Sequence, residues 1–258
     1  STDVECQQGS GCLPGGGHVS SLGGGIYARD NITLENCIVR DNLAMVTGSA
    51  ILTTMSSGGG GIYFNTGELT LRNSIFSNNS TTASCNCSGS SAISSGIHIN
   101  SGIVNVENCS ITKNTNEGLR VNGGTVEIVN SIVYFNQGSE IVGNPNVTYS
   151  DVQGGYGNPS DENIDFNPVF ESDENLQIVL GSPCIDAGNP DLIYYDECFP
   201  PSLGNERNDI GGHGGPVACD WLTDVGIPGD LNGDGAVDED DVALFAASFG
   251  SITGDPKY

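Results

Sequence analysis

The chain has 258 residues, of which 7 are Lys or Arg and 32 are Asp or Glu, so its formal net charge is -25. This charge argues against a nucleic-acid partner, because phosphate recognition needs basic surfaces. It suits a protein that works in the presence of calcium. No run of about 18 apolar residues occurs, which predicts that the chain has no membrane span.

Several features favour an exported protein. The chain begins at Ser1 without Met or an apolar leader, as expected of a mature chain after signal-peptide removal. It contains nine Cys, a number that suits disulfides, although an odd count leaves at least one thiol free or paired between chains. We therefore expect a secreted protein associated with a cell surface.

An internal repeat dominates residues 1–155. Four segments align without gaps: LENCIVRDN from Leu34, LRNSIFSNN from Leu71, VENCSITKN from Val106 and IVNSIVYFN from Ile128. Each is preceded by a shorter block: GIYAR from Gly25, GIYFN from Gly61, GIHIN from Gly96 and GLRVN from Gly118. Because the apolar residues alternate with period two, the repeats predict short strands in a stacked solenoid. The fold class is therefore all-β, and we expect about five or six coils of a right-handed parallel β-helix.

The alignment also predicts which side chains stack. Four inward columns are expected, with a degenerate fifth coil adding Val147, Ser150 and Val152: Ile26, Ile62, Ile97, Leu119; Ala28, Phe64, Ile99, Val121; Leu34, Leu71, Val106, Ile128; and Val39, Phe76, Ile111, Val133. Asn42, Asn79, Asn114 and Asn136 share one turn position, where Asn tolerates left-handed geometry and can form an amide ladder. Two insertions, 43–59 and 80–95, are rich in Ser, Thr and Ala and are expected to be corner loops.

The repeat pattern resembles the pectate-lyase-like right-handed parallel β-helix proteins over roughly residues 20–155. Farther on, NIDFNPVF, GSPCIDAG and NERNDIGGHGGP resemble the terminal coil and cap of exported bacterial β-helix proteins, which places a cap at 156–226. This resemblance implies an architecture and not a chemistry.

A calcium loop is the strongest motif, in GDLNGDGAVDEDD from Gly229. Hard oxygen ligands at this spacing wrap Ca²⁺, and Gly235 stands where the loop turns sharply. With the VALFAASFG that follows, the segment resembles half of a dockerin module, which implies a small EF-hand-like helical segment over 227–258. The expected ligands are Asp230, Asn232, Asp234, Ala236 (through its carbonyl), Asp238 and Asp241. The alternative is an Asp-rich turn without metal.

Cysteines and sequons give further expectations. Cys198 and Cys219 bracket the ERNDIGGHGGP turn and are a plausible disulfide. Cys37 and Cys109 lie two coils apart on one column, too far to pair with each other, and are expected to be small buried thiols. Six Asn-x-Ser/Thr sequons are candidate glycosylation sites, although several arise by chance in so Asn-rich a chain: Asn31, Asn78, Asn79, Asn86, Asn108 and Asn146.

An outward column of Tyr27, Tyr63, His98 and Arg120 could stack on sugars or on a partner, or form an ordinary solvent-facing ladder. Glu35, Arg72 and Glu107 share another outward column, as expected of charge pairing between coils. No His, Asp or Arg stands in a recognisable catalytic cluster, so no catalytic residue is assigned.

The preferred hypothesis is therefore a non-catalytic structural or adhesive protein. Its partners would be other copies of the chain or a cohesin-like cell-surface partner, engaged through the ends and the calcium segment. The alternatives are a polysaccharide lyase or glycoside hydrolase anchored by that segment, and a carbohydrate-binding module. Whether the calcium module is completed in cis or in trans is left open.

Overall fold

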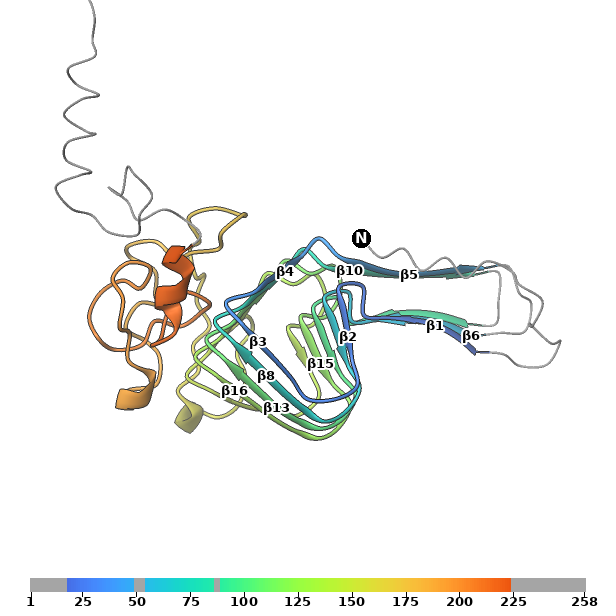
Figure 1. Cartoon of the computed structure of the whole chain (residues 1–258), viewed down its shortest axis with the longest axis horizontal. Helices are drawn as coiled ribbons and strands as arrows, with labels where there is room; N and C mark the ends of the chain where they lie inside the picture. Colours follow the sequence, from blue (N-terminus) through green and yellow to red (C-terminus); the bar gives the residue numbers. More distant parts are fainter. Residues whose placement is uncertain (1–17, 49–53, 86–88, 224–258) are drawn as a thin grey trace, which may run out of the picture. The chain divides into compact units, whose positions relative to one another are not determined.

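The computed structural model describes residues 18–48, 54–85 and 89–223. In this part the chain is all-β, and its parallel strands form stacked sheets, the arrangement of a parallel β-helix (Figure 1). The described residues up to Ala218 belong to one compact unit. The predicted boundaries at 155 and 226 remain predictions, and the expected helical calcium segment at 227–258 lies outside the described residues.

Three five-stranded parallel sheets form the stack, and each successive coil adds one strand to every sheet. The first sheet contains β2 (Ile26–Ala28), β7 (Ile62–Phe64), β12 (Ile97–Ile99), β15 (Leu119–Val121) and β18 (Ile141–Val142). The second contains β3 (Ile32–Glu35), β8 (Glu68–Arg72), β13 (Ile103–Glu107), β16 (Thr125–Val129) and β19 (Asn146–Thr148). The third contains β4 (Ile38–Arg40), β9 (Ile75–Ser77), β14 (Ser110–Thr112), β17 (Ile132–Tyr134) and β20 (Asp151–Val152).

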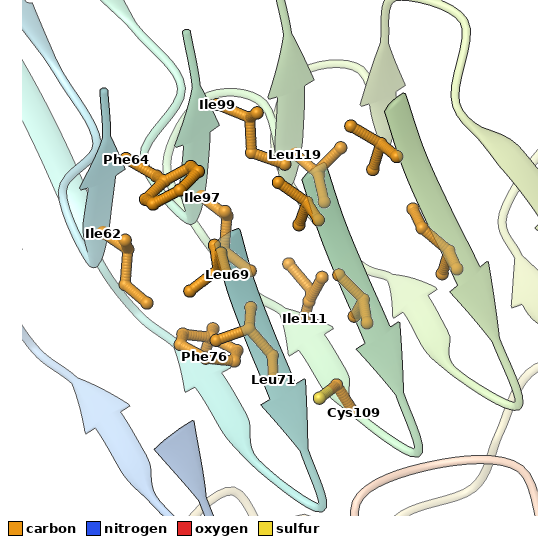
Figure 2. Close-up of a cluster of buried hydrophobic side chains, with 14 of the residues drawn as sticks. Ile62, Phe64, Leu69, Leu71, Phe76, Ile97, Ile99, Cys109, Ile111 and Leu119 are labelled. Carbon is orange, nitrogen blue, oxygen red and sulfur yellow. The ribbon is translucent and has the colours of Figure 1, made fainter. Parts of the chain in front are cut away.

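The strand register confirms all four predicted inward columns. Ile62 pairs with Ile26 and Ile97, and Phe76 pairs with Val39 and Ile111. Val147 and Val152 continue two of the columns into the fifth coil. Alternation places these side chains inside, where Figure 2 shows Ile, Leu and Phe from successive coils packed together, and most are fully buried. A side chain of this size contributes roughly 1.5–3 kcal/mol when it is fully buried.

The two insertions are not loops, and that expectation was wrong. The described parts of 43–59 and 80–95 contain four strands, β5 (Leu43–Gly48), β6 (Thr54–Gly58), β10 (Ser80–Cys85) and β11 (Gly89–Ile93). β10 pairs with β5 in parallel register, and β11 pairs with β6, which in turn pairs with β1 (His18–Leu22). Because both insertions start after equivalent residues, Asn42 and Asn79, they stack on each other as the coils do.

These insertion strands form two facing layers that extend from the stack side by side (Figure 1). The layers are filled by small side chains, since Ala44, Val46, Ser57 and Thr81 are all buried. Small residues let two sheets approach closely, and Thr81 Oγ1 lies 3.3 Å from Ser95 Oγ, within hydrogen-bond distance. The insertions therefore widen two walls of the solenoid.

The segment after β20 first continues the third sheet and then folds back along the outside of the stack. Ile164 bridges to Asp151 in parallel, next to η1 (Pro159–Asp161), and two further 3₁₀ turns follow, η2 (Leu192–Tyr194) and η3 (Ala218–Thr223). We call residues 205–215 the return segment. It places Ile210 with Ile178 and Cys184 against Ile132, which faces outward from β17.

A column of Asn residues holds the return segment. Asn36, Asn73, Asn108 and Asn130 all adopt left-handed backbone conformations, with φ between 44° and 52°. Asn73 Nδ2 donates to the Gly214 carbonyl at 2.6 Å, Asn108 Nδ2 donates to the Asp209 carbonyl at 3.0 Å, and Gly211 N–H donates to the Asn130 carbonyl at 2.8 Å. The return segment, where the sequence predicted a cap, is thus held to the side of three coils, and we refer to it as the clamp.

Candidate functional site

The predicted calcium ligands, Asp230, Asn232, Asp234, Ala236, Asp238 and Asp241, lie outside the described residues and remain predictions. Within residues 18–48, 54–85 and 89–223, no group of three or more His, Cys, Asp or Glu side chains is placed to hold a metal ion. In the same residues, no helix is long and apolar enough to cross a bilayer.

The predicted outward column of Tyr27, Tyr63, His98 and Arg120 is assembled in register by β2, β7, β12 and β15. The Tyr27 and Tyr63 rings stack with centroids 5.6 Å apart, and the Tyr63 and His98 rings stack at 4.7 Å. Both faces of the Tyr63 ring are therefore occupied within the protein. A sugar ring cannot stack on Tyr63, and only Tyr27, which is 42% exposed, has ring surface left.

His98 does not face solvent, which corrects the expectation of an exposed ladder. It is 1% exposed, and its Nδ1 lies close to Gly58 at the end of β6. Asn122 Nδ2 lies 3.0 Å from His98 Nε2, and an amide nitrogen can only donate, so Nε2 accepts. Burial, with the nearby Arg120 guanidinium, lowers the pKa of His98 to about 4. Because its imidazole is neutral and buried, His98 cannot contact a substrate and contributes to packing instead.

The charged residues of this column and its neighbour pair with each other. Arg120 forms an ion pair with Glu117, whose carboxylate also accepts the Ser94 N–H. On the second sheet, Arg72 lies 3.7 Å from Glu35 and 3.8 Å from Glu107, as the sequence predicted for charge pairing between coils. Neither arrangement leaves an acid and a base facing an open groove.

The amide ladder of Asn42, Asn79, Asn114 and Asn136 forms as predicted. From the second coil on, the Oδ1 of Asn79, Asn114 and Asn136 accepts the backbone N–H and the side-chain Nδ2–H of the Asn one coil earlier, at distances from 2.8 to 3.1 Å. The expected left-handed geometry falls instead on the preceding residues, Asp41, Asn78, Lys113 and Phe135, with φ from 54° to 64°. The left-handed residue turns the chain, so the Asn itself can point its amide along the stack.

The ladder ends on Glu140, a residue that no sequence pattern indicated. Glu140 Oε1 accepts the Asn136 N–H at 3.1 Å, and Oε2 accepts the Asn136 Nδ2–H. In the fifth coil Gly155 aligns with Asn136, because Val152 pairs with Val133. Glu140 aligns with Gly118, because Ile141 pairs with Leu119. The Glu140 carboxylate thus supplies the acceptor that an Asn supplies in every earlier coil.

The amide ladder requires glycine at the position of Gly118 and at the equivalent position of the earlier coils, such as Gly61. A Cβ on Gly61 would stand 3.0 Å from Asn79 Nδ2, and one on Gly118 would stand 2.5 Å from Asn136 Nδ2. Where the Asn is replaced by Gly155, the space opens and a side chain becomes possible. Glu140 is 9% exposed, and burial raises the pKa of its carboxyl to about 7.

Two further buried carboxylates organise the return segment. Asp209 accepts the Asp186 N–H at 2.8 Å and the Leu203 N–H at 2.6 Å, and Asp196 accepts the N–H groups of Gly215 and Asp209. Burial raises the pKa of Asp196 to about 7 and that of Asp209 to about 6. Their partners are backbone N–H groups, so these acids hold the clamp together.

The cysteine predictions are confirmed in part. Cys198 and Cys219 form the expected disulfide. Cys37 and Cys109 do not pair with each other, and burial raises the pKa of Cys109 to about 12, as fits an inert core thiol. Cys37 is partly exposed, which corrects its expected burial, because it lies in the first coil, at the end of the stack.

Burial divides the predicted glycosylation sites. Asn79 and Asn108 are fully buried and hydrogen-bonded, so neither can carry a glycan in the folded protein. Asn31, Asn78 and Asn146 are exposed, and Asn86 lies outside the described residues. Both buried sequons fall on structural Asn residues of the turns, Asn79 of the amide ladder and Asn108 of the column that holds the return segment.

The first coil has an open edge. β2, β3 and β4 each pair on one side only within the part of the chain that the structure describes. Ile26, Ile32 and Leu34 are only partly buried, whereas their equivalents in later coils are largely buried. Ile38 shares its outward column with Ile75 and Ile132, which are fully buried, yet it is 45% exposed. This coil therefore presents strand edges together with apolar side chains.

No family model, curated protein or solved structure matches the chain. Its function is therefore inferred from its own residues.

Proposed function

We propose that the chain is a non-catalytic, extracellular structural or adhesive protein. Its right-handed β-helix is a rigid body that joins other copies of the chain, or a cell-surface partner, through its ends and through the dockerin-like calcium segment at 227–258. The observation that carries this proposal is the open edge of the first coil, where three strands pair on one side only among the residues that the structure describes, beside partly exposed Ile26, Ile32 and Leu34.

Rigidity supports the same function. The described coils share a continuous apolar core, an amide ladder and a clamp along one side, so bending the stack would break many contacts at once. A spacer or filament subunit needs that stiffness.

Electron microscopy of the purified full-length protein, with calcium and with a chelator, tests the proposal. Filaments, layers or regular oligomers in calcium are expected, and their loss on chelation would assign the calcium segment its role. Monomers at high concentration in calcium, together with no binding to cell surfaces, would contradict the proposal.

A matched pair of variants locates the contact. Ile38→Lys places a charge on the edge strand β4, and Ile103→Lys places one on β13, which has a partner on each side; both residues are exposed, 45% and 52%. Lys on an edge strand opposes strand pairing. Assembly is expected to fail with Ile38→Lys and to persist with Ile103→Lys, and equal behaviour would exclude the first coil as the contact.

The alternative is a polysaccharide lyase or glycoside hydrolase anchored by the calcium segment, which rests on analogy of fold alone. An activity screen on uronate-containing and neutral polysaccharides decides between the enzyme and the structural protein. Cleavage of any of these polysaccharides would contradict the non-catalytic proposal. A carbohydrate-binding function would have to use Tyr27, whose ring is exposed, so glycan binding that survives Tyr27→Ala would exclude the aromatic column as its site.

A further inference from the structure

A hollow opens beside the last rung of the amide ladder. Its volume is about 350 Å³, and Glu140, Gln153 and Tyr156 line it together with Ile141 and Val152. Ile141 and Tyr156 also pack against the main core, so the walls belong to the rigid stack. The hollow lies where a further Asn side chain would stand if the ladder continued, since Gly155 occupies that position.

The Glu140 carboxylate in this hollow has no counter-charge. Its hydrogen bonds come from Asn136, which is neutral, and no ion pair joins it to Lys or Arg in the described ranges. The strongest influence on its pKa is burial, and no charged neighbour contributes. A carboxylate has about four lone-pair sites, and Asn136 uses two of them.

A buried carboxylate without a cation is costly unless it takes up a proton or a positively charged partner. We propose that this hollow is a binding site for a small organic ammonium ion, with Glu140 as the ionic partner.

The walls favour an organic cation over a metal ion. Only one carboxylate faces the hollow, whereas Ca²⁺ takes six to eight oxygen ligands. The hydroxyl of Tyr156 is engaged with the Gly143 carbonyl at 3.2 Å, and Gln153 Oε1 accepts the Phe135 N–H at 2.8 Å. The Tyr156 ring and the apolar Ile141 and Val152 remain to contact the carbon atoms of an alkylammonium ion, and an aromatic face attracts a cation.

Titration calorimetry with n-butylammonium chloride on the full-length protein tests the site. The protein is held at pH 8 in constant calcium, where Glu140, whose pKa is about 7, is ionised. Saturable one-to-one binding is expected for the wild type. Glu140→Gln keeps the side-chain shape and removes the charge, so affinity should fall at least tenfold, while Glu127→Gln, an exposed carboxylate on β16, should bind as the wild type does.

Two further measurements, on Tyr156→Leu and on competition by calcium, test the site even if Glu140→Gln folds poorly. Tyr156→Leu retains an apolar contact with the core and removes the aromatic face, so n-butylammonium affinity should fall severalfold. Calcium chloride added at the same ionic strength should not displace the ammonium ion. Equal heats in the wild type and in both hollow variants, or competition by calcium at that site, would overturn the proposal.

Discussion

At the residue scale, the Asn residues of the turns do two different jobs. Those of the amide ladder bond to neighbouring coils, and Asn114, which is fully buried, uses both its side-chain oxygen and its side-chain nitrogen in this way. Those of the other column, such as Asn108, adopt left-handed backbone geometry and reach outward to the return segment. One residue type thus ties coils to each other and to the clamp.

Removing one rung of the ladder should be costly. Asn114→Ala removes the acceptor of the Asn79 N–H and the side-chain donor to the Phe76 carbonyl, while Asn136 Oδ1 keeps the backbone N–H of residue 114. An unsatisfied buried group costs about 1–3 kcal/mol, so we expect the free energy of unfolding to fall by about that amount. Urea denaturation measures it, with the exposed Asn105→Ala on β13 as control. A change below about 1 kcal/mol would show that water replaces the rung.

The end of the ladder shows what sequence patterns miss. The repeat predicted the ladder because Asn recurs at one position of the alignment. Glu140 was not recognised because the fifth coil departs from the pattern at two places at once, Gly155 for Asn and Glu140 for Gly. Each change alone looks like degeneration, and only the paired register shows that one compensates for the other.

At the element scale, the insertions show a different limit. Strands β6, β10 and β11 consist mostly of Ser, Thr, Ala and Gly with few large apolar residues, so their period-two signal of hydrophobicity is weak. What makes them strands is the neighbouring coil, because β5 and β10 satisfy each other's backbone groups in register. Such pairing depends on two insertions starting at the same place in successive coils, which a pattern within one segment does not reveal.

The closeness of the two insertion layers gives a prediction. Ala44 is 1% exposed between them, so Ala44→Leu must push the layers apart. Overpacking of this kind costs typically about 1–3 kcal/mol. Thermal denaturation should show a lower midpoint for Ala44→Leu and little change for Thr47→Leu, which is exposed on the same strand. Equal midpoints would mean that the layers are loosely packed.

The clamp is the element that should open first, because it touches the stack mainly through turns and one small apolar cluster. Ile210→Ala removes a buried side chain from the cluster of Ile132, Ile178 and Cys184, which costs about 2–5 kcal/mol. The Cys184 thiol, buried beneath it and 3.3 Å from Asp151, should then react faster with a thiol reagent.

Comparing two thiols separates clamp opening from global unfolding. Cys109 lies in the main core and should keep its slow reaction in Ile210→Ala, as read by mass spectrometry of the labelled peptides. Leu192→Ala, at a side chain that is 76% exposed, serves as the control and should change neither rate. Parallel acceleration of both thiols would mean that clamp and stack unfold together.

At the scale of the whole molecule, acidity and burial combine. The chain carries a net charge of -25, yet it buries several carboxyls. Burial raises the pKa of Glu140 and Asp196 to about 7 and that of Asp151 and Asp209 to about 6. Burial also lowers the pKa of His98 and His213 to about 4. The two sets of groups act on stability with opposite signs as the pH changes.

A carboxyl whose pKa is higher in the folded than in the unfolded state stabilises the fold fully below the unfolded value, near 4, and that contribution is lost as the pH rises through the folded value. A His with a lowered pKa loses stability only as the pH falls below about 6.5. Between pH 8 and pH 6.5 the carboxyls therefore act almost alone, chiefly Glu140 and Asp196.

The protein should accordingly become more stable as the pH is lowered from 8 to 6.5. Urea denaturation at fixed calcium and fixed ionic strength measures the slope of unfolding free energy against pH. Asp196→Asn lowers stability at every pH, because an amide offers one acceptor to the N–H groups of Gly215 and Asp209, yet its slope should be shallower than that of the wild type. Asp173→Asn, at an exposed carboxylate, should keep the wild-type slope. A wild-type slope of zero or of the opposite sign would mean that the buried carboxyls are ionised throughout, held so by their backbone N–H partners.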